Sequence, residues 1–112
     1  MDLDAYLISA RRTVNPALDE RDRMVDAAAG LAEEAAEVLG LIRKRAFQQR
    51  DLPRERLVEE LGDVLWCLAI TADSLGLTLN EVAKANVEKL AKRHPDGFAA
   101  RGPEDWNRSP KE

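Results

Sequence analysis

Helical periodicity runs through most of this 112-residue chain, and it is the feature that most restricts the fold. Apolar side chains recur three and four residues apart, whereas sustained alternation and hairpin dipeptides between β-branched runs are almost absent. The helical spacing covers four segments, at about residues 4–12, 19–47, 53–75 and 78–93. The sequence therefore predicts an all-α fold, with four helices in an antiparallel bundle joined by short connections.

Turn and cap residues mark the ends of these segments. Asn15-Pro16 interrupts the chain after the first helix, and Pro53 suits the first turn of the third, where its missing N–H has no intrahelical partner. Gly76 suits the left-handed conformation that ends a helix, and residues 78–81 fit a capping box that opens the last one. Residues 94–97, His-Pro-Asp-Gly, form a compact stop signal. Each predicted helix is therefore bounded by local signals.

Length and composition favour a single domain. A chain of 112 residues with 45% hydrophobic and 34% charged residues has room for one core. We expect this domain to occupy residues 1–98, and we expect a loosely held tail, rich in Pro, Gly and charge, over residues 99–112. Cys67 is the one cysteine and lies in an apolar run, so it is expected to be a small buried residue rather than a nucleophile.

The charge pattern disfavours two classes of partner. The net charge is -4, and the 17 basic residues are scattered among acidic ones, so no patch suits a nucleic-acid backbone. No stretch approaches the ~18 apolar residues of a membrane span, and the N-terminus lacks the pattern of a signal peptide. We therefore expect a cytoplasmic protein with no nucleic-acid or membrane partner.

Two of the predicted helices carry acids beside apolar residues. Residues 30–44 read GLAEEAAEVLGLIRK, and residues 57–70 read LVEELGDVLWCLAI. At 100° per residue, Glu34 falls on the apolar side of its helix, while Glu60 and Asp63 border the apolar side of theirs. Burying like charges together is costly, so such acids must be protonated, paired with bases or bound to a cation.

A bound cation explains most of this pattern. On a helix, spacings of three or four residues bring side-chain oxygens within reach of a common point, so Glu34 with Glu37 and Glu60 with Asp63 form two facing pairs of ligands. Oxygen ligands alone favour Mg²⁺ or Mn²⁺ over zinc. Redox iron is disfavoured, because helical di-iron sites use Glu-x-x-His pairs and the one histidine, His94, is expected in a turn.

The competing interpretation is structural. Glu-rich helices are common, and Arg43 and Lys44 are available to pair with the acids. In that case the protein is a non-catalytic helical binding or dimerisation module. Two acidic segments that each border apolar positions favour the metal site over this alternative.

The spacing of the acids resembles that of the MazG-like nucleoside triphosphate pyrophosphohydrolases, an all-α group of NTP pyrophosphatases. The signature of this family is Glu-Glu-x-x-Glu on one helix and Glu-x-x-Asp on the next, present here as EEAAE at residues 33–37 and ELGD at residues 60–63. The resemblance covers roughly residues 5–98 and includes AYLISARRT, LGDVLW and ANVEKLAKRHPDGF. Ala36 and His94 depart from the Gly and Tyr of many members, but neither change removes a ligand.

The resemblance implies hydrolysis of a nucleoside triphosphate between its α- and β-phosphates, which gives the monophosphate and pyrophosphate with Mg²⁺ or Mn²⁺. It implies that Glu34, Glu37, Glu60 and Asp63 are metal ligands. Glu33 is then a further ligand or the base that orients water, and Glu33, Glu37 and Asp63 are expected to act in catalysis. The expected role is removal of non-canonical or surplus nucleotides, and phosphoribosyl-ATP pyrophosphatase is an alternative with the same chemistry.

Substrate contacts are expected on the third and fourth helices. Asn86, Lys89 and Arg93, spaced i, i+3 and i+7, share a stripe, and the resemblance favours phosphate binding over an ordinary solvated stripe. Trp66 lies one turn beyond Asp63 and either stacks on the nucleobase or fills the core.

Association of chains is also expected. Four short helices that enclose a charged pocket have little independent core, so a homodimer or tetramer is predicted, as the family resemblance also implies. Such an assembly would allow Arg12, Thr13 and the tail to contribute to the base pocket of a second chain.

Overall fold

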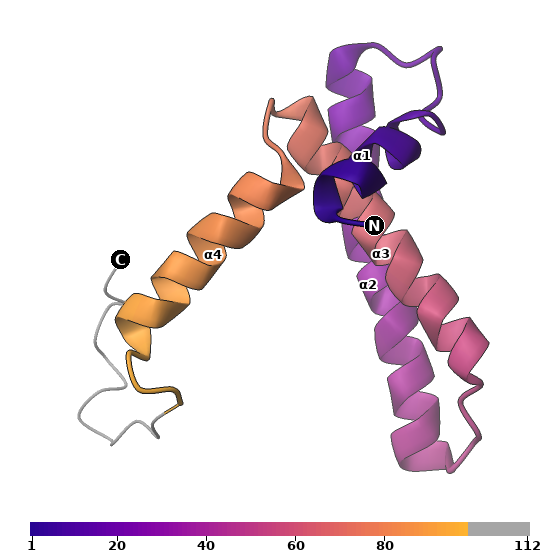
Figure 1. Ribbon diagram of the computed structural model, residues 1–112. Helices are drawn as coiled ribbons and strands as arrows, with labels where there is room; N and C mark the ends of the chain where they lie inside the picture. The colour runs from indigo at the N-terminus through magenta and orange to yellow at the C-terminus, as the bar shows by residue number, and fades with distance from the viewer. Residues whose placement is uncertain (99–112) are drawn as a thin grey trace. The chain divides into compact units, whose positions relative to one another are not determined.

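The computed structural model describes residues 1–98, and this part of the chain contains helices and no strand (Figure 1). The helices are α1 (Leu3–Arg11), α2 (Glu20–Gln48), α3 (Arg54–Ser74) and α4 (Leu79–Arg93). These bounds lie close to the predicted ones, so the all-α class and the four helices are confirmed. The predicted tail at residues 99–112 lies outside the described residues.

Aspartates begin the first two helices. The Oδ1 atom of Asp2 accepts a hydrogen bond of 2.8 Å from the N–H of Ala5, and that of Asp19 accepts one of 2.8 Å from the N–H of Asp22. Each cap satisfies a backbone donor that has no partner inside its helix. These local bonds explain why α1 and α2 begin at the residues they do.

The connections are short and use left-handed residues. Gln49, which follows α2, has a φ of 51°, and Gly76, which follows α3, has a φ of 74°. Gly76 thus takes the left-handed conformation expected from its position, because glycine reaches it without strain. Pro53 has a φ of -59° and precedes α3 instead of lying in its first turn, one position earlier than predicted.

α2 and α3 lie side by side and run in opposite directions (Figure 1). They form an antiparallel hairpin, on which α1 packs against α3. The buried core of this part is formed by two small clusters, Leu7 with Ala69, Ala72 and Leu79, and Ala10 with Ala27 and Ile70. Tyr6 packs against both clusters and so joins α1 to the hairpin.

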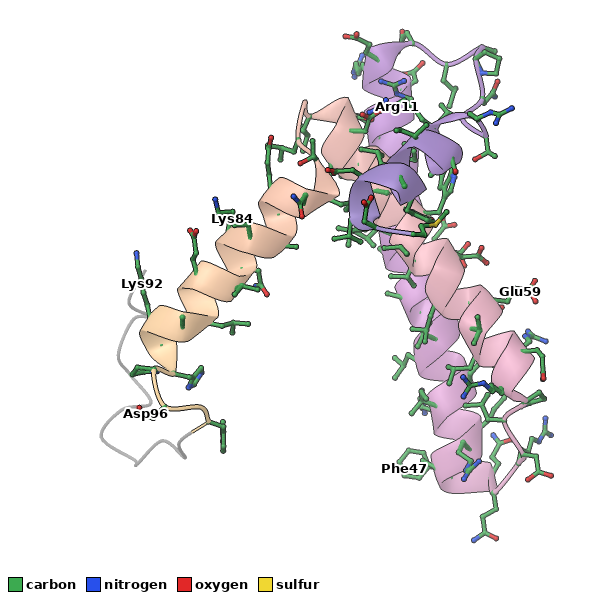
Figure 2. The ribbon with its side chains drawn as sticks, viewed as in Figure 1. Arg11, Phe47, Glu59, Lys84, Lys92 and Asp96 are labelled. Atoms are coloured by element: carbon green, nitrogen blue, oxygen red, sulfur yellow. The ribbon has the colours of Figure 1, made fainter. Side chains whose placement is uncertain are left out.

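Two polar links fasten α1 and the loop after it to α3. Arg11 (labelled in Figure 2) pairs with Asp73, with 2.7 Å between Nη2 and Oδ1 and 3.2 Å from Nε to each carboxylate oxygen. Trp66 donates from Nε1 to Oγ1 of Thr13 at 2.8 Å, and Thr13 donates in turn to the carbonyl of Ala10 at 2.7 Å. The N-terminal helix is therefore held by directional bonds as well as by apolar packing.

The described residues divide into two units, residues 1–79 and residues 80–98, so almost all of α4 is described by itself. After α4, the N–H of His94 donates to the carbonyl of Leu90 at 2.9 Å, and the N–H of Gly97 donates to the carbonyl of His94 at 3.1 Å. His94 is therefore a turn residue, as predicted. The predicted closure of the four helices into a bundle, and its assembly into an oligomer, stay predictions.

Within residues 1–98, no single helix is both long enough and apolar enough to cross a membrane. α3 and α4 have the length and apolar composition of a membrane span only when the two helices are counted together.

Candidate metal centre

Carboxylates from two helices meet on the α2–α3 hairpin. Glu34 on α2 and Glu60 and Asp63 on α3 each offer one oxygen, and these oxygens all lie within 4.8 Å of one another. Glu34 and Glu60 are half-buried, and Asp63 is exposed. The three-residue step from Glu60 to Asp63 puts both on one face of α3, and the antiparallel packing brings that face to Glu34. We call these residues the acidic cluster.

The electrostatics of the acidic cluster disfavour three ionised carboxylates. Partial burial raises the pKa of Glu34, and the negative charges of Asp63, Glu60, Glu37 and Glu33 raise this pKa further, in that order. Each neighbouring charge makes ionisation of Glu34 harder. A proton or a cation is therefore favoured between the two helices.

Few basic groups compensate the acidic cluster. Nε of Arg56 lies 3.5 Å from Oε1 of Glu60, in an i,i+4 pair whose arginine side chain is 57% exposed. In residues 1–98, the carboxylates of Glu34 and Asp63 make no hydrogen bond and no ion pair. An exposed pair of this kind stabilises little, so the cluster keeps most of its negative charge.

Arg43 and Lys44, the bases considered as partners, make no ion pair in the part of the chain that the structure describes. They line an open hollow of about 260 Å³ with Gly40, Phe47 and Gln48, toward the end of α2. This hollow contains none of the predicted site residues.

Glu33 and Glu37 lie beside the acidic cluster but outside the group of three. Both are exposed, and both contribute to the raised pKa of Glu34. Their assignments, Glu37 as a ligand and Glu33 as a ligand or base, stay predictions.

Trp66 has its polar atom occupied within the chain. The side chain is half-buried against the cluster of Ala10, Ala27 and Ile70, and its Nε1–H is bonded to Thr13. These contacts suit the core-filling role that the sequence left open, while stacking on a nucleobase stays a prediction. Thr13 was expected to contribute to the base pocket of a second chain. In this structure it accepts a hydrogen bond from Trp66 of the same chain.

The predicted phosphate-binding residues lie on α4, in the second unit. Asn86 and Lys89 are exposed, whereas Arg93 is half-buried. Nε of Arg93 is shielded from solvent and has no hydrogen-bond partner in residues 1–98. An unpaired guanidinium nitrogen is suited to an anion, but the assignments of all three residues stay predictions.

Sequence reasoning did not single out two residues near the acidic cluster, Tyr6 and Asp26. Burial raises the pKa of Tyr6, and the charge of Asp63 raises it further. Burial also raises the pKa of Cys67, with Glu34, Asp63 and Asp26 as the next causes. Asp26 lies eight residues, about two turns, before Glu34, and this spacing is a signal that sequence reasoning had available. Tyr6 had no such signal, because its place depends on how α1 packs.

A chain whose antiparallel helices bring carboxylates together belongs to the class of all-α proteins with an acidic cluster between two helices. Within that class, the sequence identifies one family. Residues 25–98 match the MazG nucleotide pyrophosphohydrolase domain, and the chain belongs to this family. The matched range contains both acidic motifs and α4. The resemblance noted in the sequence is thereby confirmed.

Two relatives extend this result. The chain is 42% identical over 74 residues to a protein of Bacillus subtilis (strain 168) named Uncharacterized protein YvdC, covering 56% of this chain and 68% of that one. It is 31% identical over 106 residues to the Gene 37 protein of Mycobacterium phage L5, covering 87% of this chain and 92% of that one. No solved structure matches the chain.

Proposed function

We propose that this chain is a divalent-metal-dependent nucleoside triphosphate pyrophosphohydrolase. The reaction adds water across the bond between the α- and β-phosphates and releases a nucleoside monophosphate and pyrophosphate. The proposed role is removal of non-canonical or surplus nucleotides. Membership of the MazG family supports the reaction class, because the family is generally one of nucleotide pyrophosphohydrolases.

The observation that carries the proposal is the acidic cluster. Its three oxygens lie within 4.8 Å, yet the only basic side chain paired with it in residues 1–98 is Arg56. Converging carboxylates without matching bases destabilise a fold unless a cation binds them. The acidic cluster is therefore better suited to binding a cation than to stabilising the fold.

The donor set fits a hard divalent cation. Carboxylate oxygens without histidine or cysteine ligands are the donors that Mg²⁺ and Mn²⁺ prefer. Glu34, Glu60 and Asp63 would hold the ion, with Glu37 as a further ligand. A bound divalent ion supplies positive charge to phosphate oxygens and makes a nearby water more acidic.

The remaining roles go to side chains near the ligands and on α4. Glu33, or Glu37, accepts a proton from the attacking water or orients it. Lys89 and Arg93 donate to phosphate oxygens, and Asn86 adds a neutral donor. Trp66 borders the nucleobase, with Thr13 fixing the orientation of its ring.

We also propose a homodimer or tetramer. α3 carries Leu61 and Leu68 seven residues apart, and their side chains are 49% and 37% exposed. Residues seven apart on a helix share one face, so this is a stripe of exposed leucines. A second chain would remove the stripe from water, and Leu61→Glu with Leu68→Glu is expected to lower the mass measured by light scattering.

The test of the reaction is a turnover panel with Mg²⁺. It covers dUTP, dCTP, dATP, dTTP, oxidised dGTP, the ribonucleotides and phosphoribosyl-ATP, with the monophosphate and pyrophosphate measured separately. Release of pyrophosphate from at least one compound is expected. Orthophosphate as the sole product, or no product from any compound, would contradict the proposal.

A matched pair of variants ties turnover to the acidic cluster. Asp63→Asn is expected to abolish release of pyrophosphate, since it removes one charged ligand and keeps the shape. Glu59→Gln is the control, because Glu59 lies on the same helix and extends outward (Figure 2). Equal losses in both variants would show that the acidic cluster is not the site.

The Arg56–Glu60 pair favours one competing function, a non-catalytic helical module whose acids are neutralised by bases. That module predicts no turnover and no uptake of Mn²⁺. Arg56→Ala separates the two, because an enzyme should then bind Mn²⁺ at least as tightly as before, whereas a structural pair should only lose stability.

A further inference from the structure

α2 and α3 come close together at a glycine of α2. A methyl group added at Gly30 would lie 2.9 Å from Sγ of Cys67, a distance at which one of the two must move. Cys67 is 7% exposed, so its sulfur is enclosed by protein. The sulfur has one dihedral to rotate, and a helix disfavours one of the three staggered positions, so escape by rotation is restricted. Adding a side chain at Gly30 would therefore push the helices apart.

This contact lies one helical turn from the acidic cluster on both helices. Glu34 follows Gly30 by four residues on α2, and Asp63 precedes Cys67 by four residues on α3. Four residues of helix rise about 6 Å. Because the helices are antiparallel, the two steps lead to the same level of the hairpin. Separation at Gly30 is therefore transmitted directly to the distance between Glu34 and Asp63.

The acidic cluster has little tolerance for widening. Oxygens on opposite sides of one Mg²⁺ ion are roughly 4.2 Å apart, twice the metal–oxygen distance. The three carboxylate oxygens lie within 4.8 Å of one another. Rotation of side chains can close a gap of this size, but a further outward shift of a helix removes a ligand from reach.

We infer that Gly30 is a positioning residue for the metal site, and that its contact with Cys67 sets the spacing of α2 and α3 at which the carboxylates share one ion. This inference rests on the proposed function, since it concerns the same ion. Gly30 touches neither the ion nor the substrate, and it acts through Glu34.

Two other glycines on the hairpin provide the contrast. A methyl group at Gly40 of α2 or at Gly62 of α3 would meet nothing within 4 Å. Neither glycine separates the helices, although Gly62 directly precedes Asp63. Gly40→Ala is therefore the matched control for Gly30→Ala, because it makes the same chemical change on the same helix.

The experiment measures Mn²⁺ affinity of the full chain by electron paramagnetic resonance of the free ion, with circular dichroism as the check on folding. Gly30→Ala is expected to raise the dissociation constant about tenfold, the scale on which residues behind metal ligands act. Gly40→Ala should leave it unchanged. Adding Cys67→Ala to Gly30→Ala removes the sulfur that the methyl group meets, and this double variant should regain wild-type affinity.

Kinetics give a second readout. If Gly30 acts through metal spacing, raising the Mn²⁺ concentration should restore most of the pyrophosphate release of Gly30→Ala. A defect that persists at saturating Mn²⁺ would overturn the inference, because it would show that the lost activity does not come from weakened metal binding.

The remaining outcomes are each decisive. Wild-type affinity in a folded Gly30→Ala variant, or weak binding in the double variant, would overturn the inference and leave the proposed function standing. Absence of Mn²⁺ uptake by the wild-type chain would contradict the proposed function and this inference with it. If Gly30→Ala does not fold, the double variant decides: folding with wild-type affinity supports the inference, and failure to fold or to bind overturns it.

Discussion

The two halves of the α2–α3 hairpin differ sharply in packing, although the same helices form both. The inner half is the part of the hairpin around Gly30 and Cys67, where there is no room for a methyl group at Gly30 and the carboxylates of the acidic cluster converge one turn away. The outer half is the part next to the loop between α2 and α3, where Gly40 faces open space and Leu39 and Phe47 are 57% and 80% exposed. Figure 2 shows Phe47 extending from this end of α2. Close packing is thus concentrated where like charges must be held together.

The hairpin thus has no room for a methyl group one turn from the acidic cluster, and it has room for one farther along α2. Apolar burial would favour close packing along the whole length of the pair. The inner half instead combines small residues, Gly30 and Cys67, with acids that resist approach. Variants that exchange properties between the two halves test this comparison.

The largest difference in pyrophosphate release is expected when one acid in each half of the hairpin is neutralised. Glu34→Gln should lower the rate of pyrophosphate release about 100-fold or more, which corresponds to about 3 kcal/mol of lost transition-state stabilisation. Glu55→Gln, which changes an exposed acid in the first turn of α3, should leave the rate nearly unchanged. Steady-state kinetics with Mg²⁺ measure both. Comparable losses would mean that the acids of the two halves are equivalent.

Truncating one large apolar side chain in each region should separate their stabilities. Ile70 is 1% exposed, so Ile70→Ala is expected to lower the free energy of unfolding by about 3 kcal/mol through lost burial and a cavity. Phe47→Ala should change it by ~0.5 kcal/mol or less, as for other exposed positions. Urea denaturation gives both values. A Phe47→Ala effect that grows with protein concentration would place Phe47 in an interface between chains.

The two glycines should give changes of opposite sign. Gly40→Ala is expected to raise the free energy of unfolding by about 0.5–1 kcal/mol, because alanine loses less backbone entropy in a helix. Gly30→Ala should lower it by about 1–3 kcal/mol, because overpacking against Cys67 outweighs that gain. Denaturation midpoints of the metal-free chains measure the difference. Stabilisation by both substitutions would show that the close approach at Gly30 is relieved without cost.

The smallest effect concerns pH. The pKa of Glu34 is raised above its ordinary value of 4.5, so the folded chain binds this proton more readily than the unfolded chain does. Its contribution to stability is present below that value and is lost as pH rises through the raised pKa. Glu34→Gln should remove this part of the pH dependence, measured by urea denaturation of the metal-free chain between pH 4 and pH 8. An unchanged pH profile would contradict the assigned cause.

Sequence alone predicted the helices, because helical spacing is local, whereas the ligand pairs of Glu34 with Glu37 and of Glu60 with Asp63 stay predictions. The caps at Asp2 and Asp19 and the left-handed Gly76 are likewise local. The grouping of Glu34 with Glu60 and Asp63 followed once the hairpin was assumed, since each acid lies toward the apolar side of its helix.

The remaining features depend on packing, which periodicity does not encode. The place of Tyr6 beside Asp63 requires α1 to cross α3 at one particular turn. The bond from Trp66 to Thr13 joins residues 53 positions apart, so no local pattern indicates it. The close approach at Gly30 depends on which residue of α3 lies opposite, and no local pattern indicates that this residue is Cys67.

The enclosed position of Cys67 has a practical consequence, because it is the only cysteine in the sequence. A thiol-labelling reagent can reach this sulfur only when the surrounding helices open, so the labelling rate measures how often they do. Substrate or metal that draws α2 and α3 together should slow labelling in proportion to occupancy. The labelling rate of Cys67 thus reports how often the helices open with and without ligand, and no cysteine needs to be introduced.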